Sequence, residues 1–207
     1  GSQWNEPGLA LRGRGSCDMK ANVAAGAFAP LFLKEMGKDI QYSYLFTADV
    51  CEEIDGFEGI PSILERGIRA EYGISGESTN LNVAIGHRGK IQFDVIIQGR
   101  SSHAATPNKG INAVTHAIPF LQAIEEYHHR LPSDPLYGPA TITVTGIQSK
   151  PKGDVAVVPS SCIIRIDRRY IPSESPDSCQ KELEELIARV SSQHQIPANV
   201  KRVNVYP

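Results

Sequence analysis

The pattern of hydrophobic and polar positions changes character near residues 82–86. Before that point, an apolar stretch with helical spacing over 21–36 precedes a short aromatic and β-branched run over 41–48. A second helical pattern covers 54–69, and a further short strand is predicted over 71–77. Strands that alternate with helices predict a parallel sheet with helices on its faces. The first part of the chain is therefore expected to be α/β.

The second part predicts elements in the order β-α-β-β-α-β, which is the ferredoxin-like split arrangement. Its first strand alternates apolar and polar residues, as a strand with one buried face does. Its last helix begins with Ser175, Pro176 and Asp177, which supply a cap, a proline at the first helical position and an early acid. We expect two domains, 1–83 and 84–207. The predicted elements of the second domain are strand 89–99, helix 111–130, strands 140–147 and 155–167, helix 176–193 and strand 200–206.

Composition narrows the class of protein. Charged residues make up 21% of the 207 residues and the net charge is −2, so no basic surface for nucleic acid is expected. The longest apolar stretches, such as 24–33, fall short of the ~20 residues of a membrane span, so no membrane partner is expected either. The four cysteines form no CxxC pair and indicate reduced thiols and a cytoplasmic location. They are Cys17, Cys51, Cys162 and Cys179.

Three segments of the first part place carboxylates at the predicted ends of strands or the start of a helix, where they could bind divalent cations. Asp18 follows two glycines and opens the first helix, while Glu52-Glu53 and Glu77 each follow a predicted strand. Open α/β sheets bind ligands at the carboxyl ends of their strands, and grouped carboxylates can hold divalent cations. Each acid also has a structural interpretation: Asp18 as a helix cap, the glutamate pair as a solvated loop, and Glu77 as a hinge or cap. None of the six histidines precedes residue 87, so this part offers no imidazole ligand.

Several motifs resemble those of the M20 family of metallopeptidases and amidohydrolases. The segment GRGSCDMK is similar to the family's GRGxxDxKG, and it is followed in order by the glutamate pair and by GEST at 76–79. The stretch HRGKIQFDVIIQGRSSHAATPNKGINAV resembles the entry into the family's dimerisation (lid) domain, and VVPSSCIIRIDRRYIP resembles a later lid strand. Some details are nearest to a subgroup linked to selenium metabolism. The resemblance implies part of a zinc-peptidase-like α/β catalytic domain followed by a ferredoxin-like lid.

The resemblance also implies roles for the four acids. Asp18 would bridge two divalent metal ions, with Glu53 binding one of them and Glu77 the other. Zinc is the first expectation, and cobalt and manganese are the alternatives. Glu52 would stay off the metals and serve as general base and then general acid.

Three lid residues receive implied roles as well. His103 would reach across a homodimer and stabilise the oxyanion in the partner's active site. Asn112 and Arg169 would bind a substrate carboxylate, Arg169 through two parallel hydrogen bonds. Structural alternatives remain open: His103 as a polar loop residue, Asn112 as a helix start, and Arg169 as the partner of a surface acid.

The implied function is hydrolysis of an amide-type bond in a small substrate such as an N-acyl amino acid, a dipeptide or a ureido compound. The family's histidine ligands lie upstream and downstream of the matched motifs, so this chain is expected to be inactive alone. Cys51 and Ala156 also differ from the family pattern, where Asp and a substrate-binding Asn are usual. The alternative is a non-catalytic dimerisation or binding module whose acids have only structural roles.

Overall fold

The computed structural model describes residues 3–5, 10–52, 58–153 and 155–206. The chain forms two compact units, Gly1–Ala84 and Ile85–Pro207. Each unit is described by itself. None of the helices in the described ranges is both long and apolar enough to cross a membrane.

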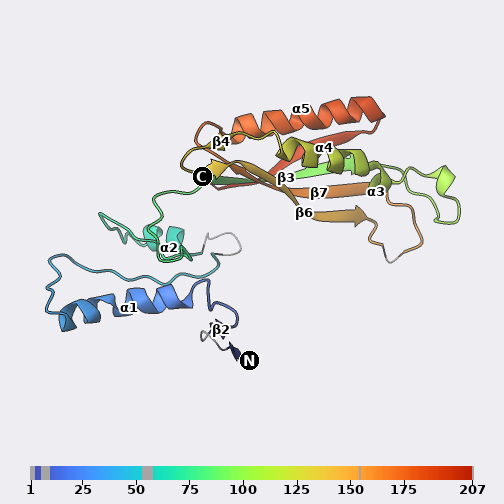
Figure 1. The fold of residues 1–207 in the computed structure, drawn as a ribbon. Coiled ribbons are helices and arrows are strands. Elements are labelled where there is room, and N and C mark those ends of the chain that lie inside the picture. Colours follow the sequence, from blue (N-terminus) through green and yellow to red (C-terminus); the bar gives the residue numbers. More distant parts are fainter. Residues whose placement is uncertain (1–2, 6–9, 53–57, 154, 207) are drawn as a thin grey trace. The chain divides into compact units, whose positions relative to one another are not determined.

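Within the described residues, the first unit forms the helices α1 and α2 and the antiparallel strands β1 and β2; α1, α2 and β2 are labelled in Figure 1. Helix α1 spans Lys20–Glu35, as the helical spacing predicted, and helix α2 spans Ile60–Glu65. Strand β1, Gln3–Asn5, pairs with strand β2, Ala10–Arg12. Part of the longer helix predicted over 54–69 falls on residues 53–57, which lie outside the described residues.

The strands predicted over 41–48 and 71–77 are wrong for this structure. Both segments run without regular secondary structure, and no described strand pairs with them. Their apolar side chains are exposed, for example Tyr42 at 86% and Ile74 at 101%. A strand exists only through hydrogen bonds to a neighbouring strand, so residue type alone does not create one. The expected parallel sheet is therefore not formed within the described residues.

The second unit has the predicted β-α-β-β-α-β order, built on a four-stranded antiparallel sheet (Figure 1). The strands lie in the order β6-β7-β3-β8, which is the ferredoxin-like arrangement. In β7 every second residue is buried, as expected of a sheet with one covered face. The main elements are β3 (Gly89–Gln98), α3 (Ala113–His116), α4 (Ile118–His128), β6 (Thr141–Lys150), β7 (Ser161–Tyr170), α5 (Pro176–His194) and β8 (Ala198–Tyr206). A short 3-10 turn, Pro107–Lys109, and the two-residue strands β4 (Ser133–Asp134) and β5 (Gly138–Pro139) complete the unit.

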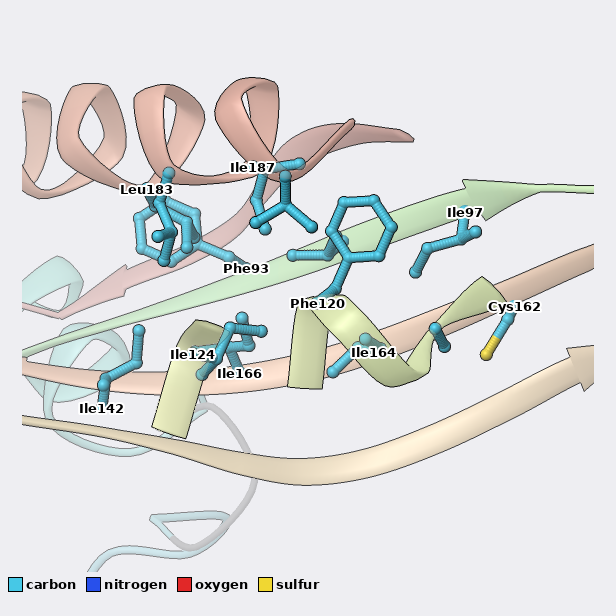
Figure 2. Packing of buried hydrophobic residues seen from close by; sticks show 14 of the residues in the cluster. Phe93, Ile97, Phe120, Ile124, Ile142, Cys162, Ile164, Ile166, Leu183 and Ile187 are labelled. Atoms are coloured by element: carbon cyan, nitrogen blue, oxygen red, sulfur yellow. The ribbon is translucent and has the colours of Figure 1, made fainter. Parts of the chain in front are cut away.

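One apolar layer between the sheet and the helices α4 and α5 forms the core of this unit (Figure 2). Phe93 from β3 and Phe120 from α4 are fully buried, and α5 contributes Leu183 and Ile187. The α5 stripe follows the helical spacing expected from the sequence. Ser175 begins α5 with a capping box in which its side chain and that of Ser178 each accept a backbone N–H.

Two element boundaries differ from the sequence prediction for reasons of proline chemistry. The helix expected over 111–130 is divided into α3 and α4 at Ala117, because Pro119 has no N–H and is best placed in the first turn of a new helix. The strand expected over 155–167 begins only at Ser161. Pro159 cannot donate a ladder hydrogen bond, and the residues before it pair elsewhere.

A buried ion pair fastens the end of β7 to the turn before α5. Arg168 is 1% exposed, and its guanidinium donates to the carboxylate of Glu174 and to the carbonyl oxygen of Arg169. The second carboxylate oxygen of Glu174 accepts the backbone N–H of Ile171 at 3.1 Å. Both terminal nitrogens of Arg168 and both carboxylate oxygens of Glu174 thus have hydrogen-bond partners, as a buried charge requires.

Candidate functional site

The structure brings the segments that carry Asp18 and Glu77 together. Ser78 Oγ donates to the carbonyl oxygen of Cys17 at 2.7 Å. Asn22 Nδ2 donates to the carbonyl oxygen of Glu77 at 2.8 Å. Both acids therefore belong to adjoining stretches of backbone, although they are separated widely in the sequence.

The approach to Asp18 requires a glycine. Gly15 has φ +76°, in the left-handed region that favours glycine, and a Cβ there would lie 2.9 Å from Lys20 Cε. The helix that follows is capped by Met19, with no side-chain hydrogen bond at the cap. The interpretation of Asp18 as a helix cap is therefore not what the structure shows.

Glu52 lies in an exposed loop after a residue with unusual backbone geometry. Cys51 has φ +62°, which residues with a Cβ rarely adopt, and its Sγ lies 3.5 Å from Glu58 Oε2. Glu53, the other member of the pair, lies outside the described residues. No contact joins Glu52 to Asp18 or Glu77 among the described residues.

The donors in the described ranges fit the expected metal ions only in part. No three His, Cys, Asp or Glu side chains come close enough together there to hold a metal ion. Asp18 and Glu77 offer oxygen only, whereas zinc sites usually include imidazole or thiolate. The described residues thus supply two carboxylates, Asp18 and Glu77, of the implied ligand set and do not complete it.

In the second unit, His103 occupies an exposed turn that is tied to residues 156–158. Ala104 N–H donates to the carbonyl oxygen of Ala156 at 2.9 Å, and Val158 N–H donates to that of Ser102 at 2.8 Å. His103 and Val157 consequently face each other as an isolated antiparallel bridge. The turn is closed by Thr106 N–H, which donates to the His103 carbonyl oxygen at 2.9 Å.

Asn112 lies next to this turn and caps helix α3. Its Oδ1 accepts the backbone N–H groups of Val114 at 2.9 Å and Thr115 at 3.3 Å. The backbone at Ala113 donates to the carbonyl oxygen of Pro159 at 3.0 Å, so the Asn112 and His103 segments rest on one stretch, 156–160. The structural alternative for Asn112, that it begins a helix, is confirmed. The Asn112 Nδ2 group is not used in the cap.

Arg169 lies at the opposite end of β7. Arg169 pairs with Lys90 on β3, and Lys90 in turn pairs with Tyr206 on β8. The other end of β7, at Ser161, lies beside the His103 loop. Eight residues of strand separate Ser161 from Arg169, roughly 26 Å at the usual rise. The Nε of Arg169 donates to Asp167 Oδ1 at 2.7 Å, which confirms the alternative that it pairs with an acid. The terminal nitrogens of Arg169 have no such contact among the described residues.

Sequence reasoning missed the role of residues 156–160 as a support for two candidate loops. The apolar run Val155–Val158 favoured continuous strand, and only Pro159 signalled that the ladder could not continue through it. Asp167 was also not recognised as the partner of Arg169. Their i, i+2 spacing on one strand face was the available signal.

Comparison with known proteins identifies the second unit. Residues 85–195 match the family described as "Peptidase dimerisation domain" of the M20 group. The chain is 33% identical over 179 residues to "Uncharacterized protein YgeY" of Escherichia coli (strain K12), covering 86% of this chain and 44% of that protein.

Two fungal relatives carry more specific names. A "Peptidase M20 domain-containing protein" of Schizosaccharomyces pombe is 36% identical over 67% of this chain and 34% of its own length. A "Probable carboxypeptidase" of Aspergillus niger is 29% identical over 89% of this chain and 45% of its own length. The chain therefore spans less than half the length of the curated relatives it matches.

Proposed function

This chain belongs to the M20 peptidase family, a generally metal-dependent family of hydrolases, and from that premise we propose that it serves hydrolysis of an amide-type bond in a small substrate. Residues 1–83 would contribute the middle of the catalytic domain, and residues 84–207 would form the lid. The observation that carries the proposal is a lid domain of the matched family in which His103 lies on an exposed turn that is hydrogen-bonded to residues 156–158. N-acyl amino acids, dipeptides and ureido compounds are the substrate classes.

The acids of the first unit supply the proton chemistry and part of the metal-binding set. Asp18, Glu53 and Glu77 would help to hold two divalent cations, which polarise a water and a carbonyl oxygen when bound. The described residues do not complete that set, so the chain is expected to be inactive alone. Glu52 is exposed, and no hydrogen bond or ion pair joins it to Asp18 or Glu77 within the described ranges, so it would take a proton from water and pass it to the leaving amine.

The lid geometry favours a homodimer in which two lids serve one substrate. His103 lies beside the start of β7 and Arg169 near its end, roughly 26 Å of strand apart. A small substrate cannot contact both residues of the same lid. His103 is therefore proposed to stabilise the developing oxyanion in the partner's site, as an N–H donor aimed at developing charge does. Arg169 would hold the substrate carboxylate through its terminal nitrogens.

The rival proposal is a non-catalytic dimerisation module, and the hydrogen bonds of two candidates favour it. Asn112 caps a helix and Arg169 pairs with Asp167, so both side chains make structural contacts within the lid. This rival predicts that changing the acids of the first unit leaves metal content unchanged.

The decisive experiment is an activity screen of a full-length protein of the relatives' size, with and without chelator. We expect Glu52→Gln to lower kcat by about 10²–10⁴-fold, the range for losing a general acid–base group, without removing the metal. Glu71→Gln, an exposed acid of the same unit, is the matched control and should keep full activity. Absence of turnover across N-acyl amino acids, dipeptides and ureido compounds would favour the rival.

A mixing experiment tests the assignment of His103 to the partner's site. Two inactive variants, Glu52→Gln and His103→Ala, are co-expressed. Half of randomly mixed dimers contain one of each, and only a residue acting across the dimer leaves one intact site in them. Recovery of about a quarter of wild-type activity is expected. No recovery would place His103 in its own subunit's site.

A further inference from the structure

The imidazole of His103 has one of its two nitrogens already committed. Its Nδ1 lies 3.1 Å from the backbone nitrogen of Ala105, which donates to it. A backbone N–H can only donate, so Nδ1 must offer a lone pair and carry no proton. A neutral imidazole has a single N–H, and here that hydrogen must therefore be on Nε2.

Two hydrogen bonds to Thr106, the residue after Ala105, hold the Ala105 N–H in place. Thr106 N–H donates to the His103 carbonyl oxygen at 2.9 Å. Ser102 Oγ donates to the Thr106 carbonyl oxygen at 3.2 Å. Ala105 lies between His103 and Thr106, which are joined by the first of these hydrogen bonds, so its N–H keeps its direction toward the ring.

The opposite strand limits the ring from another side. The two hydrogen bonds that flank the bridge run from Ala104 to Ala156 and from Val158 to Ser102, so His103 and Val157 form a non-hydrogen-bonded pair. In such pairs the Cα atoms come closest, about 4.5 Å apart, and the side chains share one face. Val157 is 36% exposed, and directly opposite residues on one face of an antiparallel pair have Cβ atoms about 4.5–5.5 Å apart, so we expect its isopropyl group to limit the space open to the imidazole.

We propose that the Ala105 backbone amide and the Val157 side chain are positioning groups that fix His103 as the Nε2–H tautomer with Nε2 directed out of the turn. This inference rests on the proposed function, in which His103 donates a hydrogen bond to the carbonyl oxygen of the partner's substrate. The tautomer makes the outward nitrogen a donor without any ionisation of the ring. A ring with its hydrogen on Nδ1 would present a lone pair to the oxygen and repel it.

Long-range ¹H–¹⁵N NMR of the ¹⁵N-labelled 207-residue chain tests the tautomer directly. The His103 signals are identified by their loss in His103→Gln. We expect neutral His103 to be the Nε2–H form alone, with a measurable coupling between Ala105 N and His103 Nδ1 across the hydrogen bond. His194, exposed near the end of α5, is the internal reference and should show both tautomers. A His103 that matches His194, or that carries its hydrogen on Nδ1, overturns the proposal.

Three substitutions separate the positioning groups. His103→Asn places an acceptor oxygen at the same two-residue spacing from the Ala105 N–H and should preserve the turn's amide shifts, whereas His103→Ala should not. Val157→Ala should keep the tautomer and the Ala105 coupling but allow the ring to sample further χ1 rotamers. An unchanged ring rotamer in that variant removes Val157 from the proposal. Because none of these signals requires turnover, a failure here is distinguishable from a failure of the proposed hydrolysis.

Discussion

The two units of this chain differ in how far their apolar side chains are buried. In the second unit, eighteen residues form one buried cluster between sheet and helices. In the first unit, no large apolar side chain of the described residues is fully buried, and Tyr72 and Leu81 stand at 86% and 105% exposure. Both units contain stretches typical of strand and helix. The difference teaches that a helix such as α1 can form from hydrogen bonds within its own segment, whereas a strand forms only where a neighbouring strand and a covering layer are available.

The largest effect is expected when the two units are prepared as separate proteins and their unfolding is compared. Residues 85–207 alone should unfold cooperatively and show dispersed amide NMR signals, because their core is complete within the unit. Residues 1–84 alone should show neither, because they bury too little apolar surface to offset the loss of chain entropy. Cooperative unfolding of the isolated first unit would remove the basis of the comparison.

A matched pair of phenylalanine truncations measures the same contrast within the chain. Phe93 is fully buried and Phe32 is 58% exposed. Phe93→Ala should lower the free energy of unfolding by about 3–5 kcal/mol, since it removes core contacts and leaves a cavity. Phe32→Ala should change it by no more than about 0.5 kcal/mol. Urea unfolding followed by circular dichroism gives both values, and equal effects would contradict the assignment of the core.

The buried ion pair of the second unit offers a comparison between charge and hydrogen bonding. Glu174→Ala leaves Arg168 buried without its partner, and a loss of about 3–5 kcal/mol in unfolding free energy is expected. The exposed Glu185→Ala on helix α5 is the control and should cost about 0.5 kcal/mol or less. Glu174→Gln, which retains an acceptor for Ile171 N–H, should fall between the two. Denaturant titration of the three variants orders them.

The buried Cys179 thiol of the second unit should make the stability of the chain depend on pH. Burial raises the pKa of Cys179 to about 11. In the unfolded chain a cysteine loses its proton near pH 8.5, so between there and pH 11 the folded state binds more protons than the unfolded state. Stability should therefore fall as pH rises through this window, by at most about 1.4 kcal/mol per pH unit from this group, and should not change on this account below it.

Unfolding titrations between pH 7 and 11 check the sign, with Cys179→Ala expected to lessen the slope relative to the unsubstituted chain. A slope that is the same in both proteins would show that the Cys179 thiol is not its source. Tyr127, whose pKa burial also raises, contributes in the same direction and remains in every variant. The comparison therefore depends on differences between slopes and not on the wild-type slope itself.

Local patterns predicted the second unit well because its signals are local. The alternation along β3, the apolar stripe of α5 and its Ser175 cap each describe contacts with near neighbours in sequence or with one covered face. Two boundaries differed from the prediction because of single prolines. Pro119 divides one predicted helix and Pro159 delays the start of β7, since the missing N–H of each proline outweighs the helix or strand propensity of the residues around it.

The amino-acid sequence by itself determined the order of elements in the lid, its covered face and the residue types available for chemistry. Only the tertiary structure decided which of those residues meet. It placed the Asp18 and Glu77 segments side by side, and set His103 and Arg169 at opposite ends of one strand. It also gave the His103 ring a backbone donor from Ala105. The physical reason is that hydrophobic periodicity reports which face is covered, whereas distances between remote residues depend on strand pairing and chain reversal.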